Sequence, residues 1–253
     1  MLAVRHTPGG SLTVVGTGIE LGAHLTAETR AHLEAADKLL YLVTDPVSAG
    51  VLVSLNPTAE SLDRFYGLHI PRRETYAAIV EEILAWVRRG AAVCAAFYGH
   101  PGVFVWPSHE AIARARQEGY PARMLPAISA EDCLFADLGL DPARCGCQSF
   151  EATDFVASGR RFDPTALLLL WQVGGIGKTD SDYSAPERGL TDLVAILARH
   201  YPADHEVILY CAASLPVCEA VLTRLPLERL PTTGFDPLAT LVVPPLPGST
   251  GRG

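Results

Sequence analysis

The sequence lacks the signatures that would assign many common functions directly. No Gly-x-Ser-x-Gly elbow, Walker loop or His-Glu-x-x-His motif occurs in its 253 residues, which disfavours serine hydrolysis, nucleotide hydrolysis and zinc-peptidase chemistry. The nearest approach to a Walker loop is GGIGKT at 174–179, where the first glycine stands too close to the lysine. The longest apolar run, at 166–171, is far too short to cross a bilayer, and the first residues form no signal-peptide core.

Charged residues are also sparse. They make up 19% of the chain against 49% apolar residues, the net charge is −8, and no basic block is longer than a pair of arginines. Nucleic-acid binding would need clustered lysine and arginine. The six cysteines are scattered, and Cys145 and Cys147 lack the spacing of a zinc site. We therefore expect a reduced, cytoplasmic protein with no structural metal and no nucleic-acid or membrane partner.

The sequence does contain a regular alternation of short apolar runs and amphipathic segments. Strands are expected at 11–15, 38–43, 91–97, 122–125, 164–173, 206–213 and 239–243. Helices are expected at 25–37, 46–55, 74–89, near 108–118, at 190–201 and at 219–225, and a polar loop at 180–188. This order predicts an α/β fold with largely parallel pairing in the first half. We divide it into lobes at 11–127 and 128–246, between flexible tails at 1–10 and 247–253.

Two turns rich in small residues follow apolar strands. Gly99-His100-Pro101-Gly102 comes after the strand at 91–97, and Ser129 to Asp132 has the spacing of a capping box at a helix start. Ligands of open α/β sheets bind at the carboxyl ends of strands, so we predict a small cofactor here. His100 is either a ligand contact or a polar loop residue, and the acidic residues after Ser129 are either helix caps or catalytic groups.

An earlier turn, GTGIELG at 16–22, resembles a dinucleotide fingerprint. Its third glycine comes one residue too late, which favours a plain tight turn and leaves NAD binding as a weaker alternative.

The clearest candidate for a catalytic group consists of Tyr66, Arg72 and Tyr76. A phenol has an ordinary pKa of about 10, and a nearby guanidinium favours its ionised form. A tyrosinate could then remove a proton from a weakly acidic N–H or O–H. Arg72 and Tyr76 are four positions apart, so they share one helix face if the helix starts early enough. The alternative is packing of the aromatic rings, with Arg72 extending to solvent.

The sequence resembles a known group of enzymes from about Ser11 to Pro245. The segments SLTVVGTGI, FYGHPGVFVWPSHEAIA, ARMLPAISAEDCLFADLGLDP and WQVG are similar to the borosin-type peptide backbone α-N-methyltransferases. These belong to the S-adenosylmethionine-dependent tetrapyrrole methylase superfamily. The resemblance implies a two-lobed tetrapyrrole-methylase-like fold with S-adenosyl-L-methionine (SAM) in the cleft between the lobes. The implied cofactor contacts are Tyr98, His100, Val103, Phe104, Ser129, Ala130, Gln172, Ala213, Thr240 and Leu241.

The resemblance also implies a catalytic role for Tyr76 and Arg72, with Tyr66 nearby. The implied reaction is repeated α-N-methylation of backbone amides in a ribosomally made precursor peptide, with S-adenosyl-L-homocysteine as the second product. Fungal members carry a tyrosine where this chain has Asp63. They also continue into a C-terminal core peptide that they methylate themselves, and the segment PPLPGSTGRG does not resemble one.

We therefore expect a split arrangement in which a separate precursor binds in trans. A homodimer is implied, and with two precursors it would form a heterotetramer. Two alternatives stay open: a methyltransferase acting on a tetrapyrrole or other small molecule, and a non-catalytic scaffold that binds SAM and a peptide.

Overall fold

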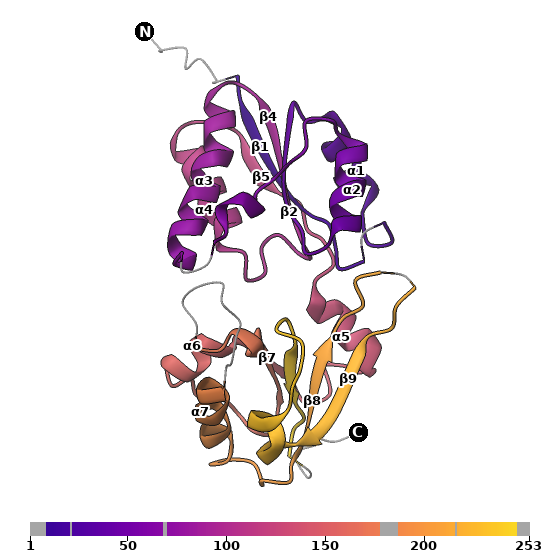
Figure 1. The fold of residues 1–253 in the computed structure, drawn as a ribbon, viewed down its shortest axis with the longest axis vertical. Helices are drawn as coiled ribbons and strands as arrows, with labels where there is room; N and C mark the ends of the chain where they lie inside the picture. Colours follow the sequence, from indigo (N-terminus) through magenta and orange to yellow (C-terminus); the bar gives the residue numbers. More distant parts are fainter. Residues whose placement is uncertain (1–8, 21, 68–69, 178–186, 216, 247–253) are drawn as a thin grey trace. The chain divides into compact units, whose positions relative to one another are not determined.

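A computed structural model describes residues 9–20, 22–67, 70–177, 187–215 and 217–246 (Figure 1). The chain divides into two compact units, residues 1–133 with 214–217 and residues 134–213 with 218–253. The division falls inside helix α5 (Ala130–Leu138), shortly after the boundary expected from the sequence. Most of the loop expected at 180–188 and most of both expected tails lie outside the described residues.

The first unit is built on a parallel sheet of five strands in the order β3-β2-β4-β1-β5. The strands are β1 (Ser11–Gly16), β2 (Lys38–Leu42), β3 (Glu60–Ser61), β4 (Ala92–Phe97) and β5 (Ala122–Met124). β1 and β4 run in register from Ser11 opposite Ala92 to Gly16 opposite Phe97. Because the sheet is covered on both faces, its central strands are nearly continuous apolar runs. The expectation of parallel pairing in the first half is confirmed.

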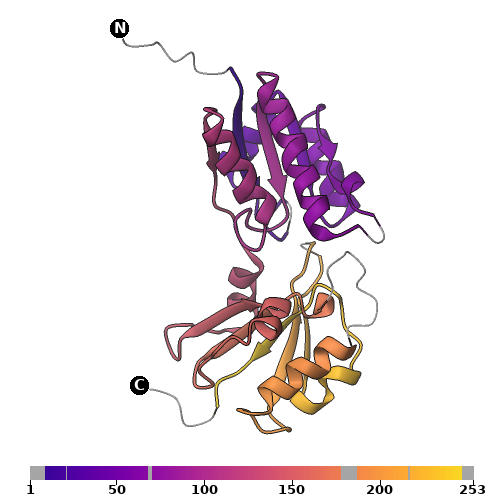
Figure 2. The ribbon, with the colours of Figure 1, turned by 90° about the vertical axis from the view of Figure 1, so that its left-hand side faces the viewer.

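Helices cover both faces of this sheet (Figures 1 and 2). α1 (Ala27–Ala35) and α2 (Pro46–Leu55) lie on one face, and α3 (Arg72–Arg88) and α4 (Trp106–Gln117) lie on the other. Each face has its own apolar cluster, one around Leu33 and Leu52 and the other around Ile79 and Ile83. α2 has the bounds expected from the sequence, whereas α3 begins two residues earlier than expected.

The second unit has a mixed sheet in the order β6-β7-β10-β8-β9. Its strands are β6 (Cys147–Glu151), β7 (Leu167–Trp171), β8 (Glu206–Cys211), β9 (Val221–Pro226) and β10 (Thr240–Val243). Only β6 and β7 pair in parallel; β10 runs antiparallel to both β7 and β8. The core is completed by Phe155 of α6 (Ala152–Ala157), Leu193 of α7 (Glu187–Leu197) and Leu230 of η3 (Leu227–Thr232).

The expected helix at 219–225 is wrong. This segment is strand β9, which pairs with β8 from Val221 opposite Cys211 to Pro226 opposite Glu206. Arg224 also donates a hydrogen bond to the Glu206 carboxylate across the pair, at 2.9 Å. The spacing of leucines in this segment is compatible with a short helix, but pairing with β8 decides the outcome. The segment at 147–155, which has no clear pattern in the sequence, divides into β6 and the start of α6.

Candidate active site

Two glycine turns meet at the carboxyl ends of β1 and β4. The N–H of Gly99 donates to the Gly18 carbonyl at 3.0 Å, and the N–H of Gly18 donates to the Gly99 carbonyl at 3.3 Å. A Cβ atom on Gly16 would lie 2.1 Å from the Gly99 carbonyl oxygen and 2.6 Å from the Pro101 ring. Contact between the turns therefore accounts for Gly16, and the φ of +72° accounts for Gly18, without a dinucleotide.

The first predicted cofactor turn follows β4 and holds Tyr98, His100, Val103 and Phe104. The His100 ring stabilises the turn, because its Nδ1 accepts a hydrogen bond from the Gly102 N–H at 3.0 Å. The Val103 N–H donates to the His100 carbonyl at 3.2 Å. Val103 and Phe104 are exposed apolar side chains. The structure thus brings these four residues together in one ordered turn with an apolar surface.

The second predicted turn precedes α5. The Ser129 N–H and hydroxyl both donate to the Asp132 carboxylate at 2.7 Å, and the Asp132 N–H donates to the Ser129 Oγ at 3.3 Å. The predicted capping box is therefore confirmed, and Asp132 has a structural role. A Cβ on Gly16 would also lie 2.6 Å from the Ala127 Cβ, so this turn borders the same end of β1 as the first turn.

Left-handed backbone marks two of the predicted cofactor residues. Phe104 has φ 56° and Gln172 has φ 58°, and within the described part of the chain they are the non-glycine residues with positive φ. Such conformations are unfavourable for residues other than glycine and cluster at ligand sites. The backbone thus supports a ligand-binding role for these two turns independently of sequence resemblance.

In the second unit, the remaining predicted residues gather at one edge of the sheet. Gln172 follows β7, Ala213 follows β8, and Thr240 and Leu241 begin the antiparallel strand β10 between them. The Val173 N–H donates to the Ala239 carbonyl at 3.3 Å, which joins the end of β7 to the start of β10. Leu241 is fully buried in the core, and it lies between Leu170 of β7 and Leu209 of β8 in the sheet.

The two turns of the first unit also suit SAM in charge. SAM carries a positive sulfonium, and neither residues 98–104 nor residues 126–131 include a lysine or arginine. The turns offer backbone carbonyls and N–H groups, the Tyr98 and Phe104 rings, and the carboxylate-bearing residue Glu131. Apolar walls with a few placed polar groups are typical of cofactor sites.

Helix α3 starts early enough for Arg72 and Tyr76 to lie on the same face. Because α3 begins at Arg72, Arg72 and Tyr76 lie one turn apart on the same face, and the Arg72 Nη2 atom is buried. The buried Thr75 hydroxyl donates to the Phe65 carbonyl at 3.3 Å, which holds the segment containing Tyr66 against the first turn of α3. Sequence reasoning missed Thr75, because its partner lies ten positions earlier in the chain.

A second residue that the sequence did not identify is Trp106. Its ring stacks on that of Tyr76, with centroids 6.4 Å apart and planes inclined by 20°. Trp106 opens α4, two positions after Phe104. The only signal in the sequence is a tryptophan placed between the first cofactor turn and a proline that starts a helix.

Ion pairs fix the segment that precedes Tyr66. The Lys38 ammonium contacts the Glu60 carboxylate at 2.6 Å, and Arg64 pairs with both Glu60 and Glu82. The hydrogen bond from Lys38 is the main cause that holds the pKa of Glu60 below its ordinary value. Asp63, the departure from the fungal pattern, is exposed and accepts a hydrogen bond from the Ser61 hydroxyl at 2.9 Å.

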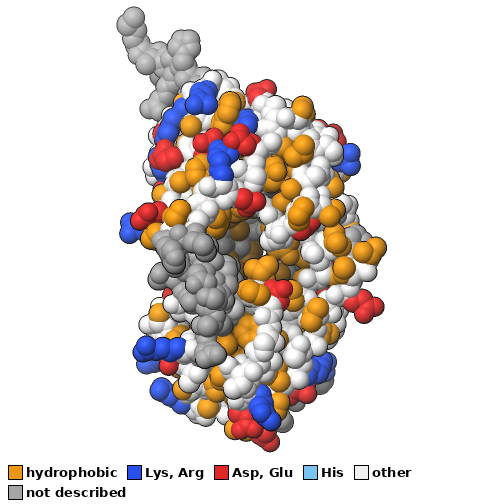
Figure 3. Space-filling view, viewed as in Figure 1, with side chains coloured by type: hydrophobic (Ala, Val, Ile, Leu, Met, Phe, Trp, Pro, Cys, Tyr) orange, Lys and Arg blue, Asp and Glu red, His pale blue; other side chains and the backbone are white. Residues whose placement is uncertain are grey.

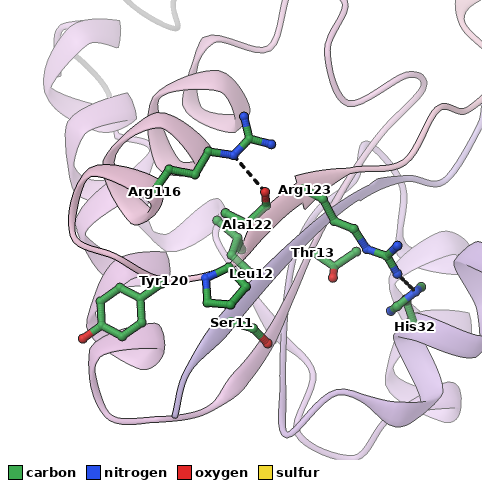
Figure 4. A pocket seen from close by; sticks show the side chains of 9 residues that line it. Ser11, Leu12, Thr13, His32, Arg116, Tyr120, Ala122 and Arg123 are labelled. Carbon is green, nitrogen blue, oxygen red and sulfur yellow. Dashed lines mark hydrogen bonds between the residues drawn. The ribbon is translucent and has the colours of Figure 1, made fainter. Parts of the chain in front are cut away.

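A cavity of about 620 Å³ lies elsewhere, at the amino ends of β1 and β5 (Figure 4). Arg116 donates to the Ala122 carbonyl and Arg123 to the His32 ring along its wall. The predicted site lies at the opposite ends of these strands, so the cavity is not part of it. The Arg116 bond occupies a carbonyl of the edge strand β5, which is a common protection of sheet edges.

The described surface carries charges of both signs. On the face seen in Figure 3, side chains of both signs are interleaved over α3 and α4, where Arg88 pairs with Glu81 and Glu118. Among the described residues, no group of three or more His, Cys, Asp or Glu is placed to hold a metal ion. None of the described helices has the length and apolar character of a membrane span.

Comparison with known proteins gives consistent matches. The profile of Tetrapyrrole (Corrin/Porphyrin) Methylases matches residues 11–231. The "methyltransferase/ribosomally synthesized cyclic peptide gymnopeptides precursor" of Gymnopus fusipes is 43% identical over 241 residues, covering 93% of this chain and 57% of that protein. The corresponding omphalotin A precursor of Omphalotus olearius is 41% identical over 225 residues, covering 88% and 54%. The chain thus spans little more than half the length of these relatives.

Solved structures agree with the fold. Uroporphyrin-III-C-methyltransferase from Thermus thermophilus has a TM-score of 0.67 at 20% identity, covering 93% of this chain and 92% of that one. A cobalt precorrin-4 methyltransferase has a TM-score of 0.65 at 15% identity, covering 96% and 98%. At these identities the likeness concerns the fold alone.

Proposed function

Because the chain belongs to the tetrapyrrole (corrin/porphyrin) methylase family, we propose that it is a SAM-dependent methyltransferase that methylates backbone amides of a ribosomally made peptide. The resemblance to this family and the α/β fold expected from the sequence are confirmed. The peptide acceptor is supported by the relatives' names, which describe methyltransferases joined to cyclic-peptide precursors. The observation that carries the proposal is the Arg72–Tyr76 pair on one face of α3. The Tyr76 ring stacks on that of Trp106, which begins the helix after the first cofactor turn.

The difficult step is activation of the acceptor. A peptide nitrogen is delocalised into its carbonyl and is a weak nucleophile. Tyr76 would take or share the amide proton through its phenol oxygen. Arg72 would stabilise the phenolate and donate hydrogen bonds to the developing negative charge on the amide oxygen. Tyr66, held beside α3 by the Thr75–Phe65 hydrogen bond, would orient the peptide.

The cofactor supplies an electrophilic methyl group on a positively charged sulfur when it is bound. In the first unit, we assign its binding to the turns that hold Tyr98, His100, Val103, Phe104, Ser129 and Ala130. Gln172, Ala213, Thr240 and Leu241 in the second unit are assigned to the same role. Phe104 and Gln172 would contribute most through backbone that is already set in an unusual conformation, since pre-formed sites lose less freedom on binding.

The finer proposal concerns the partners. We propose that the acceptor is a separate precursor peptide, methylated repeatedly and in trans, and that the protein is a cytoplasmic homodimer which binds two precursors. A short Val- and Ile-rich peptide encoded in an adjacent reading frame would be the natural acceptor. Light scattering would give the oligomeric state with and without that peptide, and mass spectrometry would show whether methyl groups appear on the peptide or on the protein.

The test is methylation of the adjacent-frame peptide, or of a synthetic Val- and Ile-rich peptide, followed as mass steps of one methylene. Tyr76→Phe and Arg72→Ala should each slow transfer by about 100-fold or more, because each removes a group needed at the reacting amide. Tyr120→Phe and Arg73→Ala are matched controls, since Tyr120 lines the distant cavity and Arg73 is exposed beside Arg72. Both controls should retain wild-type rates.

Three outcomes would contradict the assignment. Wild-type mass ladders in Tyr76→Phe and Arg72→Ala would remove their catalytic role. Methylation of uroporphyrinogen III in place of the peptide would favour the small-molecule alternative. Binding of SAM and peptide without any transfer would favour the scaffold alternative.

A further inference from the structure

Trp106 connects the two parts of the proposed site within the first unit. Its ring stacks on Tyr76 of α3 at 6.4 Å, while its backbone starts α4 directly after the turn that holds Phe104. It is 48% exposed, although it is a large apolar residue. A tryptophan that is neither in the core nor isolated on the surface needs a reason for its position.

Contacts of the neighbouring residues fix the position of Trp106. The His109 ring bonds the Gly102 carbonyl at 2.9 Å, which ties the first turn of α4 back to the cofactor turn. Pro107 stands at the start of the helix, where its fixed φ favours helical backbone. Further along, the buried Ala111 packs α4 in the same apolar cluster as α3. The cofactor turn, Trp106 and α4 are therefore joined by hydrogen bonding and packing into one element.

We propose that Trp106 is a positioning residue for methyl transfer: its indole holds the Tyr76 phenol at a fixed place relative to the cofactor turn. This inference rests on the proposed function and adds the element that sets its geometry. Offset-stacked aromatic rings attract each other beyond the effect of their burial, so the pair favours one ring position of Tyr76. Misplacement of a reacting group by about 1 Å can reduce a rate by about 100-fold.

The kinetic test compares Trp106→Ala with Trp106→Phe. Removing the ring should lower kcat by about 10-fold or more, while the Kd for SAM, measured by calorimetry, changes by less than about threefold. The phenylalanine variant keeps a ring beside Tyr76 and should keep kcat within about threefold of wild type. Tyr120→Leu is the matched control, because it removes an aromatic ring that lines the cavity at the opposite ends of the strands. It should behave as wild type.

Two kinetic results would overturn the inference. A normal kcat with a raised KM for the peptide in Trp106→Ala would make Trp106 an acceptor contact. Equal losses in Trp106→Ala and Trp106→Phe would mean that the indole is needed for another reason. If Trp106→Ala unfolds at the assay temperature, Trp106→Leu keeps the apolar volume without the ring and should show the same loss of kcat.

Fluorescence tests the ring pair without any acceptor. The chain has three tryptophans, so Trp106 alone reports in a Trp86→Phe, Trp171→Phe background. Tyr76→Leu should shift the Trp106 emission to longer wavelength, because the indole loses its cover, and Tyr120→Leu should not. An unchanged emission in Tyr76→Leu would overturn the pairing. If wild type methylates no peptide, the proposed function fails, and this measurement still decides whether Trp106 holds Tyr76.

Discussion

At the residue scale, the unusual backbone of Phe104 and Gln172 separates stability from function. A left-handed conformation costs an ordinary L-residue roughly 1–2 kcal/mol, and asparagine tolerates it best among the non-glycine residues. Both residues hold this conformation in the turns that follow β4 and β7, where the resemblance implies that the cofactor binds. The sequence therefore retains unfavourable residues at these two positions, which is typical of sites that are selected for binding.

Gln172→Asn should raise the free energy of unfolding by about 0.5–1 kcal/mol, because asparagine is less strained at a φ of 58°. The same change should weaken SAM binding, since it shortens the side chain at the proposed site. Urea denaturation and calorimetric titration with SAM measure the two effects. Gln117→Asn, on the exposed end of α4, is the control and should change neither quantity appreciably. Tighter SAM binding by Gln172→Asn would contradict its proposed role.

Local spacing predicts some of the site residues and fails for others. Arg72 and Tyr76 are one helical turn apart, so their common face follows from the sequence once the helix start is known. Thr75 and Trp106 could not be predicted in the same way. Thr75 bonds to Phe65 in a preceding segment, and Trp106 stacks on a residue of another helix, so both contacts depend on tertiary packing.

At the scale of elements, the short segment from β3 to Tyr66 depends on charge for its position. The Lys38 side chain is only 11% exposed, and its partner Glu60 is 42% exposed. Arg64 extends the group by pairing with Glu60 and Glu82. This network joins β2, β3 and α3 and fixes the segment that precedes Tyr66 in the chain. Its loss should therefore lower the stability of the fold and displace Tyr66.

Glu60→Gln should lower the free energy of unfolding by about 1 kcal/mol at pH 7, a modest value because the carboxylate is partly solvated. Lys38 holds the pKa of Glu60 below its ordinary value of 4.5, so the folded state binds this proton less readily than the unfolded state. The stabilisation is therefore present above pH 4.5 and is lost as the pH falls through the lower folded pKa.

The measurement is urea denaturation of wild type and variant from pH 7 to pH 3. The difference between them should shrink towards the acid end of this range. Glu34→Gln removes a solvent-exposed pair with Arg30 and is the matched control, with an expected effect near zero. A constant difference across the pH range would show that Glu60 acts through packing and not through its charge.

Strand pairing could be predicted from the sequence in the first unit but not in the second. In the first unit, continuous apolar strands alternate with amphipathic helices, so parallel pairing follows from the pattern. In the second unit, β10 enters between β7 and β8 although it is the last strand in the sequence. The helix expected at 219–225 fails for the same reason: the segment becomes a strand only because β8 offers it an edge. Periodicity carries no information about such distant partners.

At the scale of the whole molecule, the two units have separate cores. The apolar cluster around Leu193 and Phe155 draws its members from residues 150–246, and the clusters around Ile83 and Leu52 draw theirs from residues 12–125. Two lobes could be predicted because the chain is long enough for two cores and its composition changes after the first four apolar strands expected from the sequence. The residue at which the division falls could not, because α5 has sequence neighbours in both units.

Separate cores predict that a core mutation acts mainly within its own unit. Leu193→Ala and Ile83→Ala each remove a fully buried side chain and should cost about 2–5 kcal/mol. Hydrogen exchange should then accelerate in β7 and β8 for Leu193→Ala, and in β1 and β4 for Ile83→Ala, with little change in the other sheet. Because each variant is the other's control, differences in labelling conditions cancel. Equal acceleration in both sheets by either variant would show that the two units unfold as one cooperative body.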